Sequence, residues 1–152
     1  MMQKSRFTIT NAKASDVQSI AKLERECFSN PWSENAVSDT MGRKESIFLI
    51  AKNSEDVVGY IGCYYVLDEG YITNIAVSEN FRRQGIASAL IKKLVKKAEE
   101  KKLSFVTLEV RSRNAPAISL YEGMGFEDVG LRPRFYRDPE DDARLMTYHI
   151  KK

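Results

Sequence analysis

The chain has 152 residues, with 24 Lys or Arg against 21 Asp or Glu and a formal net charge of +3 at pH 7. This length predicts a single domain over residues 1–152 with a proper core, and a charge this mild does not favour a nucleic-acid partner. No apolar run approaches the roughly 18 residues of a membrane-spanning helix, and the first residues lack an apolar signal core. We therefore expect a cytoplasmic protein with no membrane association.

The cysteines and the histidine restrict the possible chemistry. Cys27 and Cys63 lack the CxxC spacing of a redox or metal motif, so we expect two reduced, buried thiols. The only histidine is His149, at the end of the chain in an alternating, strand-like stretch. This excludes nearly every Ser–His–Asp, Cys–His and His-ligated metal mechanism, and we expect no metal. Carboxylates, phenols, backbone amides or a cofactor must supply any chemistry.

Hydrophobic periodicity and turn residues predict the following elements in chain order. They are a strand at 7–9, helices at 16–27 and 34–41, strands at 47–52, 57–67 and 71–77, a helix at 86–102, a strand at 103–110, a helix at 115–124, and strands at 126–131 and 143–150. Residues 132–142 are expected to form a loop. The predicted fold is mixed α/β, with a mostly antiparallel sheet, one parallel strand–helix–strand crossover and helices on both faces.

The turn at residues 81–88, Phe-Arg-Arg-Gln-Gly-Ile-Ala-Ser, joins the strand at 71–77 to the long basic helix. A strand–turn–helix junction of this kind lies at the carboxyl edge of a sheet and can present free backbone N–H groups to an anion. Alternatively, Gly85 merely lets the chain turn. Neither GxGxxG nor GxxxxGK[ST] is present, so a dinucleotide dehydrogenase or nucleotide triphosphatase is not expected.

A glutamate interrupts the strand that follows this helix. Val106, Leu108 and Val110 share one face, which places Glu109 on the other face of a strand expected to be covered on both sides. Glu109 is either paired with an arginine or faces a cleft. Tyr121, on the next helix, either packs its ring with its hydroxyl in water or takes part in chemistry.

Residues 82–87 fit the [RQ]-x-x-G-x-[GA] signature of the GNAT acetyltransferases, in which backbone amides cradle the pyrophosphate of acetyl-CoA. The chain resembles that family over nearly its whole length. The further matching segments are Thr73-Asn74-Ile75-Ala76-Val77, Leu108-Glu109-Val110-Arg111, Asn114 to Ile118, Leu120-Tyr121-Glu122, Pro31-Trp32-Ser33 and Phe135-Tyr136. Together they resemble the bacterial RimI-type branch, which acetylates the N-terminal alanine of a small-subunit ribosomal protein. Ala87 and Gly123 depart from the usual residues, and neither departure removes a reactive group.

The resemblance implies a GNAT fold, acetyl-CoA as cosubstrate and a role for each matched residue. Glu109 would be the general base and Tyr121 the general acid, and the Val77 N–H would donate to the thioester carbonyl. Trp32 and Tyr136 would flank the incoming peptide. The residues implied in cofactor binding are Ile75, Ala76, Val77, Arg83, Gln84, Gly85, Ile86, Ala87, Ser88 and Asn114. Asn114 also suits the N-cap of its helix, and both roles can hold.

The implied partner is the N-terminus of a ribosomal protein, and the alternative acceptor is a lysine side chain or a small amine. A non-catalytic acyl-CoA-binding module is a third hypothesis, disfavoured because both Glu109 and Tyr121 are present. The expected late loop carries an acidic cluster, Asp138, Glu140, Asp141 and Asp142. This cluster is either a solvated turn or an exposed surface that attracts a basic N-terminus.

Overall fold

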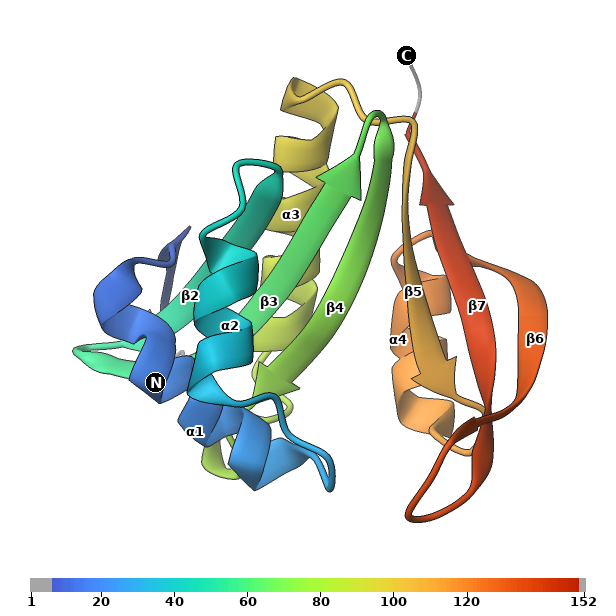
Figure 1. Ribbon diagram of the computed structural model, residues 1–152, viewed down its shortest axis with the longest axis horizontal. Helices are drawn as coiled ribbons and strands as arrows, with labels where there is room; N and C mark the ends of the chain where they lie inside the picture. Colours follow the sequence, from blue (N-terminus) through green and yellow to red (C-terminus); the bar gives the residue numbers. More distant parts are fainter. Residues whose placement is uncertain (1–6, 151–152) are drawn as a thin grey trace, which may run out of the picture.

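Seven strands form one sheet in the order β1-β2-β3-β4-β5-β7-β6 in the computed structural model, which describes residues 7–150 (Figure 1). The strands are β1 (Thr8–Asn11), β2 (Ser46–Asn53), β3 (Asp56–Val66), β4 (Glu69–Val77), β5 (Phe105–Arg111), β6 (Glu127–Tyr136) and β7 (Asp141–His149). All neighbouring pairs are antiparallel except β4 and β5, which are parallel and joined through a helix. The predicted mixed α/β fold is therefore confirmed.

The helices are α1 (Val17–Cys27), α2 (Glu34–Met41), α3 (Ile86–Glu100) and α4 (Ala115–Gly123), with short 3-10 turns η1 (Ala14–Asp16) and η2 (Glu79–Phe81). Side chains cap two of them. The Ser33 hydroxyl accepts the Ala36 N–H at 3.1 Å, and the Asn114 side-chain oxygen accepts the Ala117 N–H at 3.2 Å. These bonds satisfy N–H groups that have no partner within the helix, which fixes where α2 and α4 begin.

The helices cover both faces of the sheet, as the sequence predicted (Figure 1). On one face, Ile20 and Leu23 of α1 and Val37 of α2 pack with Phe48 and Tyr60. On the other face lies a larger core, in which Leu90, Ile91 and Leu94 of α3 pack with side chains of the sheet. The sheet residues include Leu49, Ile61, Val106, Leu108 and Met146. Because side chains alternate along each strand, neighbouring residues such as Tyr60 and Ile61 enter different cores.

The expected loop over residues 132–142 is wrong, because β6 continues to Tyr136 and forms a hairpin with β7 (Figure 1). β6 is the last strand of the sheet, and an edge strand tolerates Pro133 because its outer N–H groups need no partner. The ladder shifts register between Arg132 and Tyr136, and Arg134 adopts a left-handed conformation with a φ of 54°.

The parallel strands β4 and β5 separate soon after they meet. Their pairing covers only Glu69 to Tyr71 opposite Phe105 to Thr107, and the ribbons then diverge (Figure 1). On its other side β4 stays paired with β3, with a register shift that leaves Thr73 without an opposite residue. Such a bulge increases the local twist and bends the strand. The sheet therefore opens between β4 and β5, beside the turn at residues 81–88.

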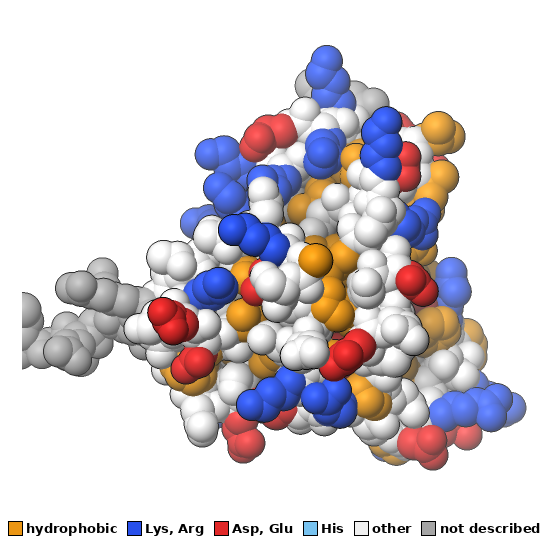
Figure 2. All heavy atoms as spheres, turned by 60° about the vertical axis from the view of Figure 1, so that its left-hand side comes forward, with side chains coloured by type: hydrophobic (Ala, Val, Ile, Leu, Met, Phe, Trp, Pro, Cys, Tyr) orange, Lys and Arg blue, Asp and Glu red, His pale blue; other side chains and the backbone are white. Residues whose placement is uncertain are grey.

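The surface shows no large region of a single charge sign on the face seen in Figure 2, where basic and acidic side chains are interspersed. Lys92, Lys93 and Lys96 of α3 are exposed, in agreement with a solvated helix face. None of the helices within residues 7–150 has the length and apolar character needed to cross a membrane.

Candidate active site

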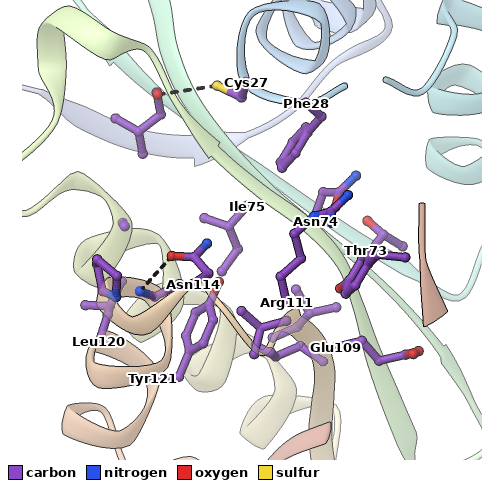
Figure 3. Close-up of a pocket in the computed structure, with 18 of the residues that line it drawn as sticks. Cys27, Phe28, Thr73, Asn74, Ile75, Glu109, Arg111, Asn114, Leu120 and Tyr121 are labelled. Atoms are coloured by element: carbon purple, nitrogen blue, oxygen red, sulfur yellow. Dashed lines mark hydrogen bonds between the residues drawn. The ribbon is translucent and has the colours of Figure 1, made fainter. Parts of the chain in front are cut away.

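A cavity of about 1250 Å³ occupies the opening between β4 and β5. Its walls come from both strands, the segment between α1 and α2 (residues 28–33, the α1–α2 segment), the turn before α3, helix α4 and the β6–β7 hairpin. Figure 3 shows Thr73 and Asn74 on β4, Glu109 and Arg111 on β5, and Asn114 and Tyr121 on α4 around this space. Residues far apart in the sequence thus line one cavity.

The turn before α3 forms one end of the cavity and leaves backbone N–H groups without protein partners. Gly85 is the N-cap of α3 with a φ of 81°, and no side chain caps this helix. Arg83 is also left-handed, with a φ of 64°. A Cβ added to Gly85 would meet nothing within 4 Å, so the space beside the turn is open. Uncapped amides at a helix N-terminus next to open space are suited to phosphate oxygens, so these residues fit a pyrophosphate group.

The end of β4 presents its backbone to the same cavity. The Ser78 N–H donates to the Val58 carbonyl at 2.8 Å, so these two residues form a hydrogen-bonded pair of the antiparallel ladder. Hydrogen-bonded and non-hydrogen-bonded pairs alternate, so the adjacent pair of Gly59 and Val77 is non-hydrogen-bonded. The N–H and carbonyl of Val77 therefore point away from β3, into the gap beside β5. Arg82 Nε donates to the Val77 carbonyl at 3.1 Å, and the N–H is left as a donor.

Glu109 combines the two roles that its sequence position left open. Its carboxylate lines the cavity and lies 3.8 Å from Arg132 Nε, too far for a hydrogen bond, with the side chain 30% exposed. Its Oε2 atom is buried and accepts no hydrogen bond from the described residues. One oxygen is therefore held near a cation, and the carboxylate keeps the capacity to accept a proton.

Two tyrosines also line the cavity. Tyr121 on α4 packs against the ring of Phe126 at 5.8 Å between centroids, and burial raises the pKa of its phenol to about 12. Burial, followed by the nearby Glu109 charge, raises the pKa of Tyr136 to about 12 as well. Arg111 lies over the Tyr136 ring at 4.5 Å and bonds the carbonyls of Arg137 and Pro139, which fastens the hairpin to β5. Both phenols are proton donors at neutral pH.

Of the residues implied in catalysis, cofactor binding and peptide binding, all but Ala76 and Gln84 line this cavity. The Ala76 side chain is buried in the core beneath α1, because alternation along β4 turns it to the opposite face from Ile75 and Val77. Gln84 lies in the turn, outside the cavity lining. The Ala76 and Gln84 side chains thus lie outside the cavity lining, and their cofactor contacts stay predictions.

The predicted exposed acidic cluster is wrong for Asp141, which is buried, and for Asp142, which is half-buried, whereas Asp138 and Glu140 are exposed. Asp141 is only 9% exposed, and its carboxylate accepts the N–H groups of Arg113 at 3.1 Å and Asp142 at 2.8 Å. Asp142 in turn accepts the Arg134 N–H at 2.8 Å. These carboxylates satisfy backbone donors of the hairpin, a role that composition could not reveal. Within the cluster only Asp138 lines the cavity.

Several cavity residues were not predicted as site residues from the sequence. Cys27 is half-buried rather than buried, and its thiol donates to the Val77 carbonyl at 3.5 Å. Burial is the main reason that the pKa of this thiol is raised. Thr73 and Asn74 face the cavity because of the bulge in β4, and Arg132 because β6 continues through the expected loop. The signal that could have found the bulge is Gly62 of β3, which lies against Thr73, because a glycine inside a strand often marks a bulge or a close approach.

A turn with uncapped amides, a carboxylate and a phenol line one cavity, an arrangement that suits a group-transfer enzyme of mixed α/β fold. Residues 17–126 match the model of the acetyltransferase (GNAT) family. The chain belongs to this family.

Relatives match over nearly the whole chain. A [ribosomal protein bS18]-alanine N-acetyltransferase of Escherichia coli K12 is 32% identical over 145 residues, which cover 94% of this chain and 97% of that protein. An N-alpha-acetyltransferase of Sulfurisphaera tokodaii is 32% identical over 154 residues, covering 93% and 92%. The crystal structure of the ribosomal-protein-S18-alanine N-acetyltransferase from Escherichia coli superposes with a TM-score of 0.90 at 29% identity, covering 97% and 96%.

Proposed function

We propose that this protein transfers the acetyl group of acetyl-CoA to the N-terminal α-amine of a protein in the cytoplasm, with the N-terminal alanine of a small-subunit ribosomal protein as the acceptor. The observation that carries the proposal is the cavity itself. It joins an anion-binding turn to a carboxylate and a phenol, and it opens between the α1–α2 segment and the β6–β7 hairpin. Relatives that match nearly the whole chain at 32% identity carry the names of α-amine acetyltransferases.

The donor end would hold acetyl-CoA through backbone groups. The uncapped N–H groups at the start of α3 would bind the pyrophosphate, and the positive end of the helix dipole adds to the attraction. When bound, acetyl-CoA supplies an activated acyl thioester. The Val77 N–H, which is directed into the gap, would donate to the thioester carbonyl oxygen as negative charge develops there.

At the acceptor end, Glu109 would take a proton from the α-ammonium group, directly or through a water, to give the nucleophilic amine. The amine nitrogen then bonds to the acyl carbon and loses its second proton to solvent as the carbon–sulfur bond breaks, and Tyr121 would donate its proton to the departing sulfur. Because the pKa of Tyr121 is about 12 against an ordinary thiol value of roughly 8.5, full transfer is uphill by about 3.5 pKa units. The tyrosine therefore acts best by sharing its proton as the bond breaks, with solvent restoring it afterwards.

The test is acetyl transfer to a panel of peptides that differ only in their first residue, each carrying an internal lysine. Mass spectrometry should locate the acetyl group on the α-amine, with the highest kcat/KM for alanine. A peptide with a blocked N-terminus is the matched control and should not be modified. Acetylation of the internal lysine in the blocked peptide, or equal activity on small polyamines, would contradict the α-amine assignment and favour the lysine or small-amine alternative.

A further inference from the structure

A carboxylate lies buried directly behind the acceptor wall of the cavity. Glu24 of α1 is 0% exposed and belongs to the layer between α1 and the sheet, among Ile20, Leu23 and Tyr60. Glutamate is almost never fully buried without partners, because removing an ionised carboxylate from water is costly. The buried carboxylate therefore requires hydrogen-bond partners, and the presence of a glutamate at this position requires an explanation.

Three donors from different elements converge on this carboxylate. The Trp32 N–H donates to Glu24 Oε1 at 2.9 Å, and Oε2 accepts the Tyr60 hydroxyl at 2.5 Å and the Asn74 side-chain amide at 3.0 Å. Burial raises the pKa of Tyr60, so its hydroxyl remains a donor. No Lys or Arg of residues 7–150 forms an ion pair with Glu24. Neutral donors alone thus satisfy the carboxylate.

Stability alone does not account for this arrangement, because an apolar residue of similar size often serves a buried position equally well. Instead, the bonds of Glu24 connect elements that build the acceptor end. Trp32 and Asn74 both line the cavity, whereas Glu24 and Tyr60 lie outside it. The network therefore joins the α1–α2 segment to β4 from the protein side of the cavity wall.

The bond to Glu24 also fixes which way the Asn74 amide is turned. A carboxylate can only accept, so the amide nitrogen must face it and the oxygen must face elsewhere. No donor within the described residues bonds this oxygen. Asn74 follows the bulge at Thr73, where β4 has left β5 and the cavity begins (Figure 3). The Asn74 oxygen is therefore an available acceptor beside the space that receives the amine.

We propose that Glu24 is a positioning residue of the acceptor site, which holds the Trp32 segment against β4 and turns the Asn74 oxygen toward the incoming ammonium group. This inference rests on the proposed function, because it requires an amine acceptor in this cavity. It assigns Glu24 no contact with the substrate and no proton transfer.

The test is Glu24→Gln in the full chain, measured with the alanine peptide and acetyl-CoA. Glutamine keeps the size, but its amide nitrogen cannot accept, so at least one donor loses its partner. We expect KM for the peptide to rise about tenfold, as for the loss of a charge-assisted hydrogen bond, with KM for acetyl-CoA unchanged within about twofold. Trp32 is the only tryptophan, so its fluorescence should also report a displaced α1–α2 segment.

Glu26→Gln is the matched control on the same helix. Glu26 is exposed and accepts the Glu79 N–H at 2.9 Å, a bond that the glutamine oxygen can keep. Neither KM nor the tryptophan emission should change. A double-mutant cycle of Glu24→Gln with Asn74→Ala should be non-additive in peptide KM, because the first residue acts through the second.

The outcomes separate this inference from the proposed function. If the wild-type protein acetylates no α-amine, the proposed function fails before any variant is compared. If the wild type is active and Glu24→Gln leaves peptide KM unchanged, or raises both KM values equally, the positioning role is refuted while the function stands. Should Glu24→Gln not fold, Glu24→Asp decides, since it keeps the carboxylate but shortens its reach to the Trp32 N–H and the Asn74 amide. The same selective rise in peptide KM supports the role, and an unchanged value overturns it.

Discussion

Replacement of Gly85 by alanine separates the two roles that the turn before α3 could have. The backbone at Gly85 has a φ of 81°, and an added Cβ would lie in open space. An L-residue in this conformation costs roughly 1–2 kcal/mol, partly offset by about 0.4–1 kcal/mol from the reduced chain entropy of the unfolded state. The net destabilisation should be about 1 kcal/mol, which corresponds to a fall in Tm of about 2–4 °C for a chain of this size.

The effect on the cofactor is separate from this strain. If the open space holds the pyrophosphate, the new methyl group displaces it from at least one backbone N–H. A hydrogen bond to a charged group contributes about 1.5–3 kcal/mol, so the affinity for acetyl-CoA should fall at least tenfold. Isothermal titration calorimetry gives this affinity, and thermal denaturation of the unliganded protein gives the cost of strain.

Gly123→Ala provides the matched control. An added Cβ at Gly123 also meets nothing within 4 Å, but this glycine lies in α4 without a positive φ. Alanine should therefore stabilise the protein by up to about 1 kcal/mol and leave acetyl-CoA affinity unchanged. If Gly85→Ala lowers Tm but binds acetyl-CoA as tightly as the wild type, the turn serves only to redirect the chain, and the cradle assignment is refuted.

Further expectations concern the reactive groups and the hairpin. Glu109→Gln and Tyr121→Phe should each lower kcat by about 10²–10⁴ with unchanged affinity for acetyl-CoA. Near wild-type turnover in both variants would show that Glu109 serves only as an ion-pair partner of Arg132 and that Tyr121 serves only in packing. Because the pKa of Tyr121 is raised to about 12, its proton is retained as pH rises, and kcat should show no descending limb from this group below about pH 11. A limb near pH 10 would indicate a solvated phenol. Asp141→Ala should lower the free energy of unfolding by about 1–3 kcal/mol in thermal denaturation, because it leaves the part-buried N–H groups of Arg113 and Asp142 without their acceptor. The same change at the exposed Glu140 should leave stability within about 0.5 kcal/mol.

Local patterns were sufficient to predict most of the fold and much of the site. The alternation around Leu108 and Val110 placed Glu109 on the opposite face of its strand, and the residue type of Asn114 predicted its cap. The single glycine at position 85 predicted the turn, because a positive φ there has a direct sequence signal. The roles of the reactive residues came from family resemblance and still require the experiments above.

Features set by long-range packing could not be predicted in this way. Pro133 has the same local preference in a loop and in an edge strand, so only the position of β6 in the sheet decides between them. The burial of Asp141 depends on donors from residues 113 and 142, and the environment of Glu24 depends on partners 8, 36 and 50 positions away. From sequence alone, a carboxylate in a helix or turn is predicted to be exposed to solvent, and only its tertiary neighbours show otherwise.

The broken ladder of β6 also bears on how the protein avoids aggregation. This edge strand carries the exposed apolar side chains Val129, Leu131 and Phe135. An edge strand with exposed apolar residues could pair with another copy of the protein during synthesis. Pro133 offers no N–H, and the left-handed Arg134 interrupts the row of backbone groups that a further strand would need. The irregular stretch lines the acceptor end of the cavity and also prevents a further strand from pairing with the sheet edge. Mutations that make it regular should therefore lower the solubility of the protein.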